Sequence, residues 1–253
     1  MPDTVTAAVL IIGNEILSGR TQDANLAYLG QNLNEIGIQL KEARVVSDDE
    51  AEIVDAVNAL RARYDYVFTT GGIGPTHDDI TADSVAKAFG VGIDYHPEVY
   101  EVLKENFESR GMAVNEARMR MARIPDGAKL IDNTVSLAPG FEIENVFVLA
   151  GVPSIARAMF EGAKNRLRGG ATVLSRSIRV HTGEGTVAAD LAEAQTVFPD
   201  VDMGSYPWSE NGKFGTSLVL RSTDKERLDL AFDYVFKLAE DLGGEPREES
   251  VSD

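Results

Sequence analysis

The chain contains no cysteine, and this absence excludes several kinds of chemistry at once. Disulfides, thiolate nucleophiles and Cys-ligated zinc sites cannot form. Basic residues are also in short supply, because 24 lysines and arginines stand against 41 aspartates and glutamates, for a formal net charge of −17. A chain with this charge repels nucleic-acid phosphates and anionic lipids at long range. We therefore expect neither nucleic acid nor a membrane as the main partner.

Long hydrophobic runs are missing as well. The apolar run in MPDTVTAAVLIIGNE ends at polar GNE after too few residues for a signal peptide or a membrane span, and no basic segment precedes it. The sequence therefore predicts a cytoplasmic protein. Residues 246–253 are polar and charged without apolar periodicity, which predicts a disordered tail.

The first two thirds of the chain alternate between two kinds of apolar pattern. Residues 6–13 and 65–70 are short, nearly continuous apolar runs, typical of parallel strands buried on both faces. Residues 24–36 and 50–63 carry apolar side chains at helical spacing, with 39–46 as a strand between them. This alternation predicts an α/β domain over 1–168, with a doubly wound and mostly parallel sheet.

The pattern changes after Gly169 and Gly170. A strand, a helix, two strands and a second helix follow, which predicts a small α+β domain of β-α-β-β-α order over 171–245. The chain of 253 residues is long enough for two such cores.

The segment TTGGIGPTHDDIT, residues 69–81, directly follows the strand predicted at 65–70. Loops at the carboxyl ends of parallel strands are where ligands bind in doubly wound sheets. Gly71, Gly72 and Gly74 permit positive φ and close approach of the backbone to a ligand, and the N–H groups of the next helix can bind an oxyanion. A Gly-Gly turn by itself is equally typical of an ordinary turn.

Carboxylates accompany these glycines. Asp79 and Thr81 precede the next helix, and Asp48 lies at the carboxyl end of the strand at 39–46, so that Asp48 and Asp79 could face one crevice. Each of the three could instead be a helix cap. Asp78 and Asp79 supply two adjacent carboxylates, however, where one residue would suffice as a cap.

Carboxylates beside a phosphate repel it unless a divalent cation lies between them. Mg²⁺ is commonly held by one or two carboxylates together with substrate phosphates. The loop therefore predicts a site for phosphate and metal, with Asp48 and Asp79 as catalytic residues that ligate the metal or activate water.

The same residues carry a family resemblance. TTGGIGPTHDDIT resembles the signature loop of the MoaB/Mog molybdopterin-binding fold, and most of all that of the N-terminal domain of CinA-type competence/damage-inducible proteins. IGNEILSGRTQDANLAYL, VVSDD and AGVP resemble further parts of that domain in the expected order. The resemblance covers roughly residues 5–168.

The resemblance implies a function. In the Mog branch the loop aspartate usually follows an arginine, whereas Asp78 stands there in this chain, which weakens a role in molybdenum-cofactor synthesis. CinA-type proteins are associated with metal-dependent cleavage of ADP-ribose, and a similar domain of eukaryotic FAD synthases with FAD hydrolysis. We therefore expect a hydrolase of a nucleotide pyrophosphate that uses Mg²⁺, Mn²⁺ or Co²⁺, with K⁺ as a further candidate.

Two other interpretations stay open. One is a molybdopterin-binding protein without hydrolase activity, for which molybdopterin is the ligand. The other is a catalytically silent scaffold, since this fold commonly self-associates, and the resemblance implies a homo-oligomer, either a dimer or a trimer.

Further positions are expected to bind the ligand by their place in these motifs. Their more ordinary roles would be a local hydrogen bond for Glu15, an exposed cation for Arg20 and a solvated loop side chain for His77. The full set of expected phosphate- and ligand-binding residues is Gly71, Gly72, Gly74, Pro75, Thr76, His77, Asp78, Thr81, Glu15, Ser18, Arg20, Asn25, Gly151 and Pro153.

The second domain resembles the KH-like domain of CinA proteins. KH domains bind nucleic acid through a Gly-x-x-Gly loop between two helices. Gly212 and Gly215 have this spacing but lie between two predicted strands, which is typical of a hairpin. This placement and the acidic charge both disfavour RNA binding.

Overall fold

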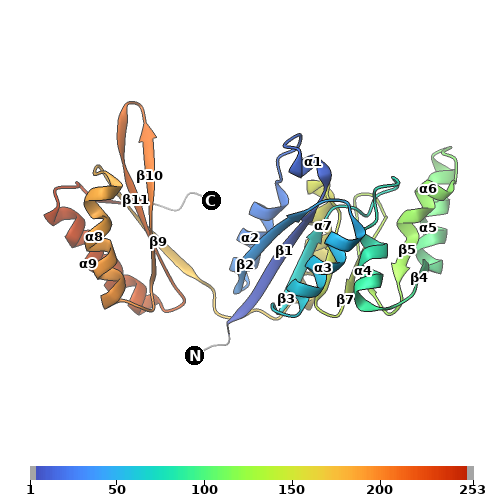
Figure 1. Cartoon of the computed structure of the whole chain (residues 1–253), viewed down its shortest axis with the longest axis horizontal. Helices are drawn as coiled ribbons and strands as arrows, with labels where there is room; N and C mark the ends of the chain where they lie inside the picture. The colour runs from blue at the N-terminus through green and yellow to red at the C-terminus, as the bar shows by residue number, and fades with distance from the viewer. Residues whose placement is uncertain (1–3, 250–253) are drawn as a thin grey trace. The chain divides into compact units, whose positions relative to one another are not determined.

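The computed structural model describes residues 4–249 and divides into two compact units between Gly170 and Ala171 (Figure 1). Within the described residues, no helix has the length and apolar character needed to cross a membrane.

The first unit is built on a six-stranded sheet of order β2-β1-β3-β8-β7-β6. The pairs among β2, β1, β3 and β8 are parallel, while β7 and β6 are antiparallel additions at one edge. The strands are β1 (Val5–Ile12), β2 (Ile38–Val46), β3 (Tyr66–Thr70), β6 (Lys129–Ile131), β7 (Gly140–Ile143) and β8 (Val146–Leu149). The predicted doubly wound, mostly parallel sheet is confirmed.

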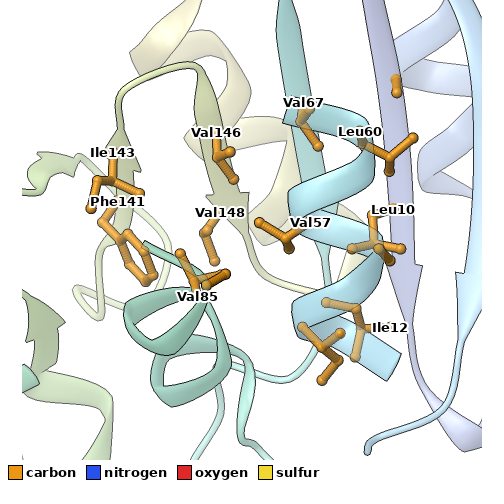
Figure 2. Close-up of a cluster of buried hydrophobic side chains, with 14 of the residues drawn as sticks. Leu10, Ile12, Val57, Leu60, Val67, Val85, Phe141, Ile143, Val146 and Val148 are labelled. Atoms are coloured by element: carbon orange, nitrogen blue, oxygen red, sulfur yellow. The ribbon is translucent and has the colours of Figure 1, made fainter. Parts of the chain in front are cut away.

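Helices cover both faces of this sheet, because its central strands are apolar on both sides. They are α1 (Asn14–Leu17), α2 (Asn25–Glu35), α3 (Glu50–Arg61), α4 (Thr81–Phe89) and α7 (Pro153–Ala163), followed by the 3₁₀ turn η2 (Lys164–Arg166). On one face Val57 and Leu60 of α3 and Val85 of α4 pack against Leu10 and Val148 of the sheet (Figure 2). On the other face Leu29 and Leu33 of α2 and Phe160 of α7 pack against Phe68 and Phe147. Burial of these side chains fixes the register that brings the carboxyl ends of β1, β3 and β8 to one edge.

An insert separates α4 from β6. It consists of the helices α5 (Pro97–Ser109) and α6 (Glu116–Met119) and a two-stranded sheet of β4 (Ile93–Tyr95) and β5 (Arg123–Pro125). The insert has a small core of its own, in which Leu103 and Phe107 contact Met119 and Ala122. The 3₁₀ turn η1 (Arg120–Ala122) joins α6 to β5.

The second unit has the predicted β-α-β-β-α order, followed by one further strand that was not predicted. Its elements are β9 (Leu174–Val180), α8 (Glu184–Val197), β10 (Asp202–Glu210), β11 (Lys213–Ser222), α9 (Lys225–Asp241) and β12 (Arg247–Glu249). The sheet order is β10-β11-β9-β12, and α8 and α9 pack against it through a core that includes Leu191, Phe232 and Val235. Gly212 has a φ of 76° in the turn between β10 and β11, so the Gly-x-x-Gly spacing belongs to a hairpin.

One boundary prediction is wrong. The tail predicted as disordered over 246–253 includes β12, which pairs antiparallel with β9, and Glu249 accepts hydrogen bonds from Arg179 and from the Ser217 hydroxyl. The composition of this segment is typical of a tail, but its glutamates find arginine and serine partners that are distant in sequence. Residues 250–253 lie outside the described residues.

The start of the sheet contains a carboxylate that should make stability depend on pH. Asp65 Oδ2 accepts hydrogen bonds from the backbone N–H and the hydroxyl of Thr6, both at 2.8 Å. These bonds lower the pKa of Asp65 below its ordinary value of 3.8. A folded-state pKa below the unfolded one contributes stability above the unfolded pKa, and this contribution is lost as pH falls through the folded pKa.

We therefore expect Asp65→Asn to lower the melting temperature at pH 7, because Asn accepts these bonds without the charge. The difference from wild type should shrink as the pH is lowered below about 4. Thermal melts of both proteins between pH 7 and pH 3 measure it. A difference that stays constant over this range would contradict the linkage.

Candidate functional site

A cleft of about 560 Å³ opens at the carboxyl ends of β1, β3 and β8. The edge is the one at which the sequence predicted the ligand site. Eight of the residues expected at the site line the cleft, namely Glu15, Gly71, Gly72, Gly74, Pro75, Asp79, Gly151 and Pro153. The glycine loop and the turn before α7 therefore form two of its walls.

The glycines at the start of the loop are required by the backbone. Gly71 has a φ of 105°, and a Cβ there would overlap with the carbonyl oxygen of Ile12. Gly72 has a φ of 69°, and a Cβ there would overlap with the Thr81 hydroxyl. Gly151 packs against Gly71, since a Cβ on Gly151 would lie 3.2 Å from the Gly71 Cα. Two loops far apart in sequence thus meet backbone to backbone at the floor of the cleft.

Thr81 holds the loop and does not cap the following helix. Its backbone N–H donates to Gly72 O at 2.9 Å, and its hydroxyl donates to Gly71 O at 3.0 Å. The side chain is fully buried, so it supports the cleft from behind. No side chain caps the N-terminus of α4.

Asp79 folds back over the loop. Its Oδ2 accepts hydrogen bonds from the Thr76 backbone N–H at 2.7 Å and from the Thr76 hydroxyl at 2.5 Å. Gly74 leaves room for this arrangement, because a Cβ there would lie 2.7 Å from Asp79 Oδ2. Both bonds fall on Oδ2, so the other carboxylate oxygen is available to a ligand. The alternative role of Asp79 as a helix cap is not what the structure shows.

Asp48 does not line the cleft and contacts α1 instead. Its Oδ2 accepts a hydrogen bond from Asn14 N at 2.8 Å, at the first residue of α1. The helix that follows Asp48 in sequence is capped by Asp49, which accepts from Ala51 N and Glu52 N. The cap role considered for Asp48 thus belongs to its neighbour, while Asp48 fixes the short helix that carries Glu15.

In the SGRTQDAN segment, Thr21 lines the cleft, whereas Ser18, Arg20 and Asn25 do not. Ser18 and Arg20 are exposed and do not line the cleft, and the Ser18 hydroxyl donates to Glu15 O at 3.2 Å. Asn25 is buried, and its Nδ2 donates to Gly151 O at 2.8 Å. Asn25 therefore ties the start of α2 to the Gly151 turn rather than pointing into the cleft.

The exposed tip of the loop carries Thr76, His77 and Asp78, none of which lines the large cleft. His77 Nδ1 lies 4.0 Å from Asp78 Oδ1. A ligand could reach these three side chains only where it extends out of the cleft.

The cleft also has walls that the sequence did not indicate. They are formed by Thr21, Met121, Ser136, Ala138, Ile155 and Met159. Met121 comes from the insert, and Ser136 and Ala138 precede β7, so no local motif connects them with the glycine loop.

The charges of the lining are all of one sign. Of the described residues that line the cleft, only Glu15 and Asp79 are charged. Within residues 4–249, no group of three or more His, Cys, Asp or Glu side chains could hold a metal ion unaided. A cation bound here would need further oxygen ligands from water or from a ligand.

Comparison with known protein families supports this division into two domains. Residues 8–169 match the family "Probable molybdopterin binding domain", and residues 172–242 match the family "FAD synthase, middle domain". A protein from Aeropyrum pernix is 36% identical over 266 residues, which cover 98% of this chain and 99% of the relative. A "Probable FAD synthase" from Caenorhabditis elegans is 30% identical over 253 residues, which cover 90% of this chain but only 49% of that protein.

A solved structure confirms the predicted resemblance to CinA-type proteins. The crystal structure of the protein CinA from Thermoplasma acidophilum, of unknown function, is 33% identical with a TM-score of 0.60 and covers 65% of this chain and 99% of that one. The glycine loop, the sheet behind it and these matches lead to one conclusion. The chain belongs to the molybdopterin-binding domain family, with the MoaB/Mog-like fold.

Proposed function

We propose that the cleft binds a nucleotide pyrophosphate, such as ADP-ribose or FAD, and hydrolyses it with the help of a divalent metal ion. One observation carries the proposal: a glycine loop suited to phosphate lies beside Glu15 and Asp79 in a cleft whose described lining has no cationic side chain. A pyrophosphate in such a cleft requires a cation to offset the repulsion.

The donor set fits Mg²⁺, Mn²⁺ or Co²⁺. Asp79 and Glu15 would hold the ion together with phosphate oxygens of the ligand, and the ion when bound would neutralise charge on the pyrophosphate. Asp79 presents the oxygen that Thr76 leaves free, either to that ion or as acceptor of the proton of the attacking water. Asp48, expected from the sequence to be a ligand, would act by positioning α1.

The rest of the cleft suits the organic part of such a ligand. Ile155, Val152, Ala138 and Met121 contribute apolar surface to its lining. Ligand sites typically combine an apolar lining with a few convergent polar groups. The match of the second unit to the middle domain of FAD synthase supports a ligand of the FAD or ADP-ribose type.

The test is incubation of the protein with ADP-ribose, FAD or NAD in the presence of Mg²⁺, Mn²⁺ or Co²⁺, with AMP release measured by chromatography. We expect AMP release from at least one substrate, and its loss when EDTA removes the metal. Absence of AMP release from every combination would refute the hydrolase. Release that persists in EDTA would refute the metal requirement.

A second candidate is molybdopterin binding without hydrolysis, favoured by the family match over 8–169. The same glycine loop would then receive the terminal phosphate of the pterin. Tight molybdopterin binding by a protein that releases no AMP from any nucleotide would select this function.

A further inference from the structure

A small side pocket adjoins the large cleft, between the glycine loop and the insert. This side pocket has a volume of about 20 Å³, and its polar lining comes from Gly72, Gly74, Asp79, Asp83, Arg120 and Arg123. Gly72, Gly74 and Asp79 also line the large cleft, so the two spaces share a wall. A space of this size holds roughly one water molecule or one oxygen atom.

The side pocket contains the guanidinium groups that the large cleft lacks. Arg123 is already paired, because its Nη1 lies 2.7 Å from Asp83 Oδ1 and 2.8 Å from Asp83 Oδ2. Arg120 has no carboxylate within ion-pair distance among the described residues. Its Nη1 donates only to the carbonyl oxygens of Thr76 at 3.3 Å and His77 at 3.4 Å.

These two long hydrogen bonds hold Arg120 against the loop but use only part of its hydrogen-bonding capacity. A guanidinium has five N–H donors, and here only those of Nη1 have partners in the part of the chain that the structure describes. Arg120 is half-buried and comes from η1, so the insert delivers a positive charge to the back of the glycine loop.

We propose that Arg120 binds a phosphate oxygen of the ligand that enters the side pocket. The inference rests on the proposed function, since it needs a phosphate in the cleft. The pocket admits one oxygen, and the free donors of Arg120 would supply a charge-assisted hydrogen bond to it. Arg120 would then offset part of the negative charge of the phosphate, and the carbonyl oxygens of Thr76 and His77 keep its guanidinium group oriented before the ligand arrives.

Two substitutions separate this role from simple support of the loop. Arg120→Gln keeps an N–H donor for the carbonyls of Thr76 and His77 but removes the charge, while Arg120→Lys keeps the charge. Arg110→Gln, at the exposed end of α5, is the matched control for loss of one arginine in the insert. Affinities for ADP-ribose and for inorganic pyrophosphate, each with Mg²⁺, are measured by calorimetry.

We expect Arg120→Gln to weaken both ligands by about 10- to 100-fold, as for loss of a hydrogen bond to a charged group. Arg120→Lys should recover part of this loss, and Arg110→Gln should bind like wild type. In turnover assays, the KM of Arg120→Gln should rise more than its kcat falls.

Wild-type affinity in Arg120→Gln would overturn the inference. It would show that residue 120 only supports the loop through a hydrogen bond and that its charge does not contribute to binding. A wild-type protein that binds neither ligand would overturn it together with the proposed function. Binding that depends on Arg120 in a protein that releases no AMP would keep the inference and refute only the hydrolase. AMP release that is unaffected in Arg120→Gln would keep the hydrolase and refute only the inference.

Discussion

Replacing Asp79 with asparagine is expected to lower metal-dependent AMP release by about 10³-fold, while the protein stays folded. A general base or metal-bound carboxylate typically contributes about 10² to 10⁴ in rate. Asparagine has nearly the same shape and can still accept the Thr76 hydrogen bonds, so the loop should keep its conformation. What it loses is the negative charge and the second oxygen, because an NH2 group, which donates and cannot bind a cation, takes the place of the oxygen that Thr76 leaves free.

The control for this experiment is Asp55→Asn, which removes the same charge from an exposed position on α3. It should keep wild-type activity, and both variants should keep the wild-type melting temperature within a few degrees. Initial rates of AMP release with the best substrate and metal measure the effect. An Asp79→Asn protein that hydrolyses at the wild-type rate would remove Asp79 from the mechanism.

The position of Asp79 shows what the sequence could predict. The apolar run at 65–70 ends in three glycines within four residues, and the alternation of strands and helices puts this loop at the ligand-binding edge of a parallel sheet. These signals are local or periodic, so they were sufficient for the edge, for the loop and for one of its carboxylates.

The other walls of the cleft depend on contacts between distant segments. Arg120 and Met121 lie about fifty residues after Gly71 and Gly72 in the chain and reach the loop because the insert has its own core around Leu103. No periodicity in the sequence specifies where that core places η1. The prediction for Asp48 has the same limitation, because the hydrogen bond to Asn14 depends on how α1 lies beside the end of β2.

Glycines and an aspartate can share this loop because different contacts hold them in place. The backbone of Gly71 and Gly72 is fixed by contacts with Ile12 and Thr81, and the folded-back Asp79 is fixed by Thr76. These are separate sets of contacts on two sides of one loop. Under the proposed function, the glycines would therefore let the backbone approach a phosphate closely while Asp79 offers a carboxylate oxygen to a cation.

The glycine side of the loop gives the second large effect, which is on stability. Gly71→Ala is expected to destabilise the fold by more than about 3 kcal/mol. A φ of 105° is poorly tolerated by any residue with a side chain, and the added Cβ would overlap with the carbonyl oxygen of Ile12, the last residue of β1. The backbone cannot move away freely, because Gly71 N donates to Leu149 O and Gly71 O accepts from Thr81.

Gly19→Ala separates the cost of a positive φ from the cost of the overlap between the added Cβ and its neighbours. Gly19 also has a positive φ, of 71°, but a Cβ added there would have no atom within 4 Å, so only the backbone cost of about 1 kcal/mol is expected. Urea unfolding of both variants, followed by circular dichroism, gives the two free energies. Equal destabilisation would show that the contact of Gly71 with Ile12 adds nothing to the backbone cost. A much larger loss for Gly71→Ala follows if the close approach of β1 to the glycine loop is what holds the floor of the cleft in place.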